Sequence, residues 1–292
     1  AMDILTNYTF QIVALGSVIL AVAAAPVGAF SVYKGQSLIG DAIGHSTFPG
    51  IVLAYMAFAT RSPVVLLLGA VAAGAASYAL IQLAHRDKRL GLDANLAIFL
   101  SGFFGLGMTL KSFIQGNPDY AGASQAGLGT YIFGQAAYML EADVQLICIV
   151  SAAVFLLLLL FYKELKLFVF DAEYAEVVGL PCRLLNILLL VMTIAVIGIG
   201  IKAVGAILIS SFLIIPCVAA NQWSNSLSRV LVLSSLIGAV SALVGTYIST
   251  LEQGMSTGPS IILIASLIAF FSILFGTKGI LGRTLKRRQE HG

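Results

Sequence analysis

The chain has 292 residues, of which 59% are hydrophobic and only 10% are charged, and its mean hydropathy is +1.00. Soluble domains carry about 25% charged residues, so this composition excludes a soluble globular protein and predicts an integral membrane protein. The formal net charge of +3 comes from basic residues scattered along the chain, a distribution that does not favour nucleic-acid binding.

Nine apolar stretches recur along the chain, close to the length of about 17–25 residues that crosses a hydrocarbon core. They are residues 11–33, 38–58, 63–84, 94–113, 144–162, 184–201, 204–220, 227–248 and 261–275. The first has no basic region before it, so we expect it to stay as a helix rather than be removed as a signal peptide. Together they predict one all-α transmembrane domain over residues 1–292, a polytopic bundle of eight or nine helices.

The number of spans depends on the glycine-rich junction "IGIGIKAVG", which can be a tight hairpin or the break in one helix. Nine spans with an external amino terminus place most basic residues in the cytoplasm, as the positive-inside rule predicts. These residues are Lys34, Arg86, Lys88, Arg89, Lys163, Lys166, Arg183, Arg229, Lys278, Arg283, Lys286, Arg287 and Arg288. The carboxyl-terminal tail, about 277–292, is then cytoplasmic, whereas eight spans would move the amino terminus inside.

Two ionisable residues, Asp41 and His45, interrupt the second span. A spacing of four places both side chains on one face of a helix, and an ionisable pair inside a membrane marks a functional site by default. Carboxylate oxygen and imidazole nitrogen suit first-row divalent cations such as manganese, zinc or iron(II). Two ligands are too few for a stable site, so a twofold dimer could supply two more. The alternative is structural: Asp41 caps the helix or forms a buried ion pair with His45.

The residues around this pair predict how the span packs. Pro49 should bend the helix, and the hydroxyls of Ser46 and Thr47 should bond backbone carbonyls rather than a metal. Gly40 and Gly44 form a small face that permits close approach of another helix.

The segment "KELKLFVFDAEYAEVVGLPCR", about 163–183, is the longest connection assigned to the cytoplasm. Apolar residues follow helical spacing at Phe170, Tyr174, Val177 and Val178, with Asp171, Glu173 and Glu176 off that stripe and a stop at Gly179 and Pro181. Helices that rest on membranes favour a basic polar face, so this short amphipathic helix is better suited to docking on a cytoplasmic partner.

No GxxxxGK[ST] loop occurs in the sequence, so any drive by ATP must come from another subunit. On the opposite side, residues 115–143 form a long connection with Asp119, Glu141 and Asp143. It can be a re-entrant or surface helix that receives a delivery protein, or a plain loop over the bundle.

The chain resembles the membrane permeases of bacterial ABC importers for manganese, zinc and iron. The resemblance runs through "GDAIGHSTFPGIVLAY", "FDAEYAEVVGLP", "AVGAILISSFLIIPCVAA" and "STGPSIILI", in order along nearly the whole chain. It implies that Asp41 and His45 are metal ligands and that residues 163–183 couple to an ATPase. One departure is Gly44, where the family more often has serine, and "YIFGQAAYM" is more similar to manganese-type members.

The resemblance further implies a homodimer in the bacterial plasma membrane, with cytoplasmic ATP-binding subunits and an extracytoplasmic solute-binding protein. We therefore expect an importer subunit that moves divalent metal ions, has no catalytic residue and holds no permanent cofactor. The main alternative is a secondary transporter or channel in which Asp41 and His45 relay ions or protons. An ABC permease for iron chelates would need a broader cavity, and a metalloenzyme would need more ligands.

Overall fold

The structure, a computed structural model, describes residues 7–60, 62–85, 91–117, 139–205, 209–251 and 255–279. Within these ranges the secondary structure is entirely helical. The helices are α2 (Tyr8–Tyr33), α3 (Ser37–Phe58), α4 (Pro63–His85), α5 (Leu92–Gly116), α7 (Glu141–Leu160), α8 (Tyr162–Phe170), α9 (Ala172–Val177), α10 (Cys182–Val204), α11 (Ile209–Asn221), α12 (Leu227–Leu251) and α13 (Thr257–Phe275).

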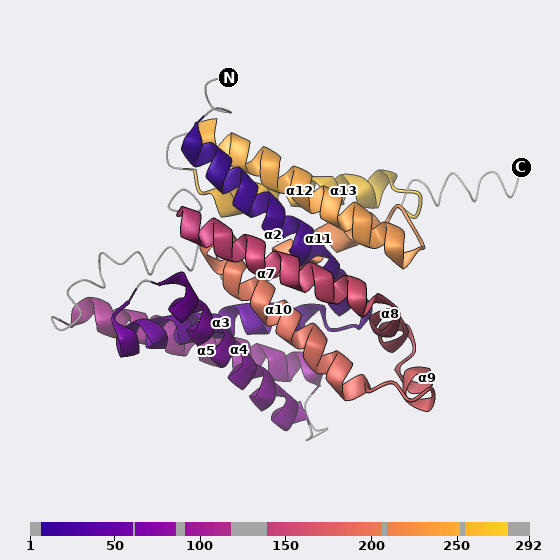
Figure 1. Cartoon of the computed structure of the whole chain (residues 1–292), viewed down its shortest axis with the longest axis horizontal. Coiled ribbons are helices and arrows are strands. Elements are labelled where there is room, and N and C mark those ends of the chain that lie inside the picture. Colours follow the sequence, from indigo (N-terminus) through magenta and orange to yellow (C-terminus); the bar gives the residue numbers. More distant parts are fainter. Residues whose placement is uncertain are drawn as a thin grey trace, which may run out of the picture.

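Helix α2 lies at the centre of the bundle and contacts α7, α10, α11 and α12. Figure 1 shows α12 and α13 on one side of it and the group α3, α4 and α5 on the other. Leu20, Ala24, Val27 and Phe30 of α2 are completely buried. A helix that is apolar all round is stable in a protein core or in lipid, and the neighbours of α2 cover most of it.

Two pairs of helices approach each other at glycine residues. A Cβ on Gly28 of α2 would lie 2.0 Å from the Leu213 carbonyl oxygen of α11, and one on Gly50 of α3 would lie 2.1 Å from that of Gly69 in α4. At Gly40, by contrast, a Cβ would meet only the end of the Leu213 side chain, at 3.6 Å. The close contact of α3 with α4 is therefore made at Gly50 rather than at Gly40.

Each of the nine predicted spans coincides with a helix, but the number able to cross a membrane differs from the predicted eight or nine. Among the described residues, seven helices are long and apolar enough, and neither α3 nor α11 is one of them. Helix α3 has 22 residues, but its polar side chains, Asp41 and His45 among them, lower its hydropathy. Helix α11 has 13 residues and rises about 20 Å, less than the roughly 30 Å of a hydrocarbon core.

The described residues on either side of the junction between α10 and α11 show where the two helices end and begin. Gly205 ends α10 with φ of +98°, a conformation that favours glycine. A Cβ on Gly200 would lie 2.4 Å from the Ile209 side chain, so the start of α11 lies beside the last turns of α10. The two helices are therefore separate elements and do not form one continuous rod.

Polar contacts gather the ends of several helices at one end of the bundle. The Tyr33 hydroxyl of α2 donates to the Asn221 side chain at the end of α11, at 3.0 Å, and Lys278 donates to the Ser224 carbonyl oxygen at 2.7 Å. The Tyr33 ring also lies 5.3 Å from that of Phe170 at the end of α8. Lys34, the segment 163–183 and Lys278 thus share one end, as the predicted orientation requires; the membrane side itself stays a prediction.

Two predicted features fall largely outside the described residues. Residues 118–138, which include "YIFGQAAY" and most of the predicted outer segment, are not described, and neither are residues 280–292 of the tail.

The close contact at Gly28 predicts that two Gly→Ala substitutions will change the free energy of unfolding differently. Gly28→Ala forces a methyl group onto a backbone carbonyl and should lower the free energy of unfolding by about 1–3 kcal/mol. Gly102→Ala, in α5, meets nothing within 4 Å and should leave stability unchanged or raise it by up to about 1 kcal/mol. Thermal unfolding of both purified variants in detergent tests this, and equal melting temperatures would contradict the packing at Gly28.

Candidate metal-binding site

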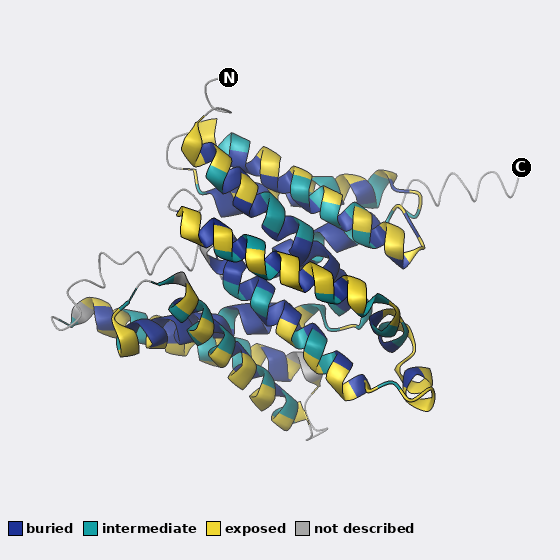
Figure 2. Cartoon of the chain, viewed as in Figure 1, coloured by how far each residue is buried: buried dark blue, intermediate teal, exposed yellow. Residues whose placement is uncertain are grey.

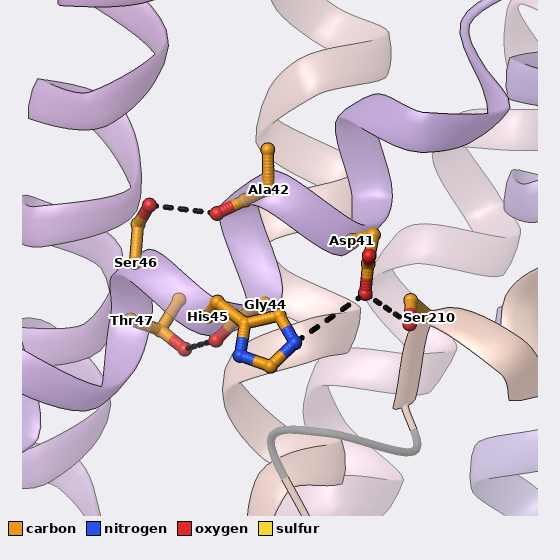
Figure 3. A network of polar contacts seen from close by, with 7 residues as sticks. All are labelled: Asp41, Ala42, Gly44, His45, Ser46, Thr47 and Ser210. Carbon is orange, nitrogen blue, oxygen red and sulfur yellow. Dashed lines mark hydrogen bonds and ion pairs between the residues drawn. The ribbon is translucent and has the colours of Figure 1, made fainter. Parts of the chain in front are cut away.

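Asp41 and His45 lie on the same face of α3, as their spacing predicts. The His45 Nε2 is 3.6 Å from the Asp41 Oδ1, and the Ser210 hydroxyl of α11 donates to the same oxygen at 2.8 Å (Figure 3). Ser210 is the second residue of α11, so the short helix begins beside the carboxylate. Two helices that are far apart in the sequence therefore build the site.

The pair is only partly covered by the chain. The side chain of Asp41 is 32% exposed and that of His45 is 12% exposed, while the Phe104 ring of α5 meets the imidazole edge-on at 5.0 Å. The His45 Nδ1 is buried and has no hydrogen-bond partner among the described residues. A buried polar atom without a partner is costly, so this nitrogen is the part of the pair that the described residues leave unsatisfied.

Of the two structural explanations for the pair, only one fits the geometry. Asp41 is the fifth residue of α3, whose N-cap position is Gln36, so the carboxylate does not cap the helix. An ion pair with His45 remains compatible with the 3.6 Å separation. Within the described ranges, no third His, Cys, Asp or Glu joins the two side chains in a group that could hold a metal.

The neighbouring hydroxyls bond the backbone rather than the site. Ser46 Oγ donates to the Ala42 carbonyl oxygen at 2.6 Å and lies 2.7 Å from the Ser77 hydroxyl of α4, and Thr47 Oγ1 donates to the Gly44 carbonyl oxygen at 2.6 Å. Both side chains are fully buried. They satisfy carbonyls of α3 near Pro49 and help to hold α3 against α4.

The segment 163–183 forms two helices where the sequence predicts one. The backbone leaves helical geometry at Asp171, whose Oδ1 accepts the Tyr174 amide at 2.9 Å and so caps the start of α9. Gly179, with φ of +87°, ends α9 as predicted. The acidic residues Glu173 and Glu176 are exposed.

The apolar stripe of this segment is uncovered (Figure 2). The exposed fractions are 56% for Phe170, 55% for Tyr174, 84% for Val177 and 56% for Val178. Ala175 lies off this stripe and is fully buried, and α9 packs on α8 and α10. An apolar stripe exposed on a short acidic helix is typical of a surface that docks a partner.

Sequence reasoning missed Ser210 and Phe104 as parts of the site. The signal for Ser210 was the polar pair in "ISSFLIIP", inside an otherwise apolar run. Nothing in the sequence distinguished Phe104 from other aromatic residues that face apolar neighbours.

An ionisable pair inside a bundle of apolar helices, with an exposed apolar stripe on the segment 163–183 at one end, is typical of polytopic membrane proteins of the transporter class. The comparison with known families agrees, because residues 6–276 match the model of the ABC 3 transport family. The chain belongs to the ABC 3 transport family and is the membrane permease component of an ABC transporter, not its ATPase.

Similar proteins share most of this length. The chain is 39% identical to the "Zinc transport system membrane protein TroC" of Treponema pallidum, over 99% of this chain and 96% of TroC. It is 38% identical to the "Manganese transport system membrane protein MntC" of Bacillus subtilis, over 92% of this chain and 61% of MntC. Among solved structures, PsaBC of Streptococcus pneumoniae, in complex with Fab, matches with a TM-score of 0.85 and 27% identity over 98% of each chain.

Proposed function

We propose that the chain is the permease subunit of an ATP-driven importer that moves divalent transition metal ions into the cytoplasm. The observation that carries this proposal is the Asp41–His45 pair in an ABC permease. The pair is partly exposed, and one imidazole nitrogen is buried without a partner in the part of the chain that the structure describes. Asp41 and His45 bind the ion transiently, while Ser210 holds the carboxylate in position. The whole chain acts as one membrane domain in the bacterial plasma membrane, with its carboxyl terminus in the cytoplasm.

The incomplete ligand set supports a homodimer. Two side chains cannot satisfy a cation that takes four or more ligands, and a second copy would bring another Asp41 and His45. A site shared across a twofold axis can be dismantled by a small separation of the two copies. Such a site suits transport because the ion must leave as readily as it enters.

Two further partners complete the importer. An extracytoplasmic solute-binding protein delivers the ion, and cytoplasmic ATP-binding subunits dock on the exposed stripe of α9 and neighbouring residues. Movement of this segment, driven by ATP binding and hydrolysis, then alternates access to the site. The permease itself contributes positioning and ion binding but no chemical step.

Manganese is the first candidate for the transported ion, followed by zinc and iron. Similarity alone does not separate them, because one relative is named for zinc at 39% identity and another for manganese at 38%. Nitrogen and oxygen sites bind zinc more tightly than manganese, so selectivity for manganese would arise from delivery and from the geometry of the shared site.

Removal of either ligand tests the site. In proteoliposomes that contain the permease, its ATPase and its binding protein, Asp41→Ala and His45→Ala should each reduce ATP-dependent uptake of manganese or zinc to background, since each removes a ligand. Ser77→Ala, which removes only a hydroxyl bonded to Ser46, should retain most uptake. Normal uptake by both ligand variants would refute the site, and uptake that continues without ATP would favour the secondary transporter.

Ser210→Ala should weaken transport without abolishing it. The substitution removes the donor to the Asp41 carboxylate, and groups that orient metal ligands typically contribute about 10–100-fold to affinity or activity. Ser211→Ala is the matched control because, among the described hydrogen bonds, the Asp41 carboxylate accepts from Ser210 and not from Ser211. Metal concentration dependence of uptake measures both variants, and an unchanged half-saturation concentration for Ser210→Ala would contradict the role of Ser210.

A negative charge on the exposed stripe of α9 should weaken binding of the ATP-binding subunit. Val177 is 84% exposed, so Val177→Asp costs little in folding but desolvates a carboxylate if a partner covers it. We expect loss of co-purification of the ATP-binding subunit by at least about 10-fold. Asn225→Asp adds the same charge to an exposed residue near the same end of the bundle and should retain the complex; equal retention by both variants would contradict docking at α9.

A further inference from the structure

The turn between α2 and α3, residues 34–36, lies between the segment 163–183 (the docking segment) and the candidate site at Asp41 and His45. In this turn the backbone amides of Lys34, Gly35 and Gln36 each donate to a carbonyl oxygen in the last turns of α2, at 3.0 Å. Gly35 adopts φ of +72°, which lets the chain fold back tightly. Because the turn is bonded at three consecutive amides, it is a stiff connection, and displacement of Lys34 is passed on to α3.

Lys34 joins this turn to the docking segment and to α10. Its Nζ lies 4.7 Å from the centroid of the Phe168 ring in α8 and donates to the Asn186 side-chain oxygen of α10. Asn186 in turn donates to the Tyr78 hydroxyl of α4 at 2.9 Å. Phe168 is buried, so its ring should move together with α8. Movement of α8 would then change the position of the ring relative to Lys34.

Tyr33 joins the same segment to α11. Its ring lies 5.3 Å from the Phe170 ring at the end of α8, one residue before the break at Asp171. Its hydroxyl donates to the Asn221 side-chain oxygen at 3.0 Å. One aromatic residue therefore contacts both the docking segment and the last residue of α11.

These two routes converge on one carboxylate. The first runs from Lys34 through the turn into α3, where Asp41 lies one helical turn after Ser37. The second runs along α11, from Asn221 to Ser210, which donates to Asp41. Helix α11 spans the distance of about 20 Å between these two contacts, with Pro216 inside it, and its backbone lies against that of α2 at Gly28.

The contacts of Lys34 are of a kind that can break and re-form during a transport cycle. Burial lowers the pKa of its ammonium group to about 8, and no carboxylate is paired with it among the described residues. The Asn186 amide and the Phe168 ring bind the ammonium group more weakly than a carboxylate at the same position would.

We propose that Tyr33 and Lys34 are positioning residues that transmit movement of α8 and α9 to Asp41, along α11 and along α3. The inference rests on the proposed function, because it requires an ATPase docked on α9 and an ion bound at Asp41. When the segment moves, Tyr33 displaces α11 and Lys34 displaces the start of α3. The Asp41 carboxylate then loses or regains its place beside Ser210 and His45.

The test measures the number of ions transported per ATP hydrolysed in the reconstituted complex. Tyr33→Phe removes only the hydroxyl bonded to Asn221, and Lys34→Met removes the charge and the donor but keeps the apolar stem. We expect each substitution to lower the ratio by about 3- to 10-fold, with ATP hydrolysis and assembly of the complex retained. Ser249→Ala, which removes a hydroxyl bonded to Thr257 at 3.2 Å between α12 and α13 and lies on neither route, should keep the ratio of the unmodified protein.

A double-mutant cycle separates transmission from a general structural effect. Tyr33→Phe and Ser210→Ala act at opposite ends of α11, so if α11 transmits the movement, the double variant should lose little more than the stronger single variant. Effects on the ratio that multiply would overturn the route through α11, and an unchanged ratio in Tyr33→Phe and Lys34→Met would overturn the proposal while leaving the importer intact. Absence of ATP-driven metal uptake by the unmodified complex would instead refute the proposed function, and the transmission with it.

Discussion

The cost of holding a carboxylate inside an apolar bundle governs how α3 and its neighbours are built. Asp41 accepts a hydrogen bond from Ser210 at 2.8 Å and faces His45, so its charge is compensated by polar groups rather than by water alone. Ser210 is the second residue of α11, so this short helix begins beside α3, after α10 has ended at Gly205.

The same arrangement gives α11 a contact at each end. Its first turn meets the candidate site, and its last residue meets Tyr33, whose ring also contacts Phe170 at the end of α8. Between them the backbone passes so close to Gly28 of α2 that a side chain would not fit there. Along its length α11 also packs against α3, α12 and α13, so these helices surround the connection between its two ends.

Much of the fold and the centre of the site could be predicted from the sequence, because both leave local patterns. Long apolar runs ended by glycine, proline and charge located the helices, and the spacing of Asp41 and His45 placed them on one face. The partnership of Asp41 with Ser210 could not be predicted, because it joins positions 169 residues apart and neither position shows it alone. The division at Asp171 was missed because amphipathic spacing continues through it, while the aspartate side chain supplies a new helix cap.

The polar character of α3 also has a consequence for how the protein enters the membrane. A charged side chain costs about 2.5–3.5 kcal/mol at the middle of an inserting helix and less toward an end. Asp41 is the fifth of the 22 residues of α3, which also carries His45 and two buried hydroxyls. Its contact with α4 at Gly50 and Gly69 is close enough for backbone to meet backbone. During synthesis, α3 is therefore expected to wait at the translocon and to partition into lipid together with α4, as a helical hairpin.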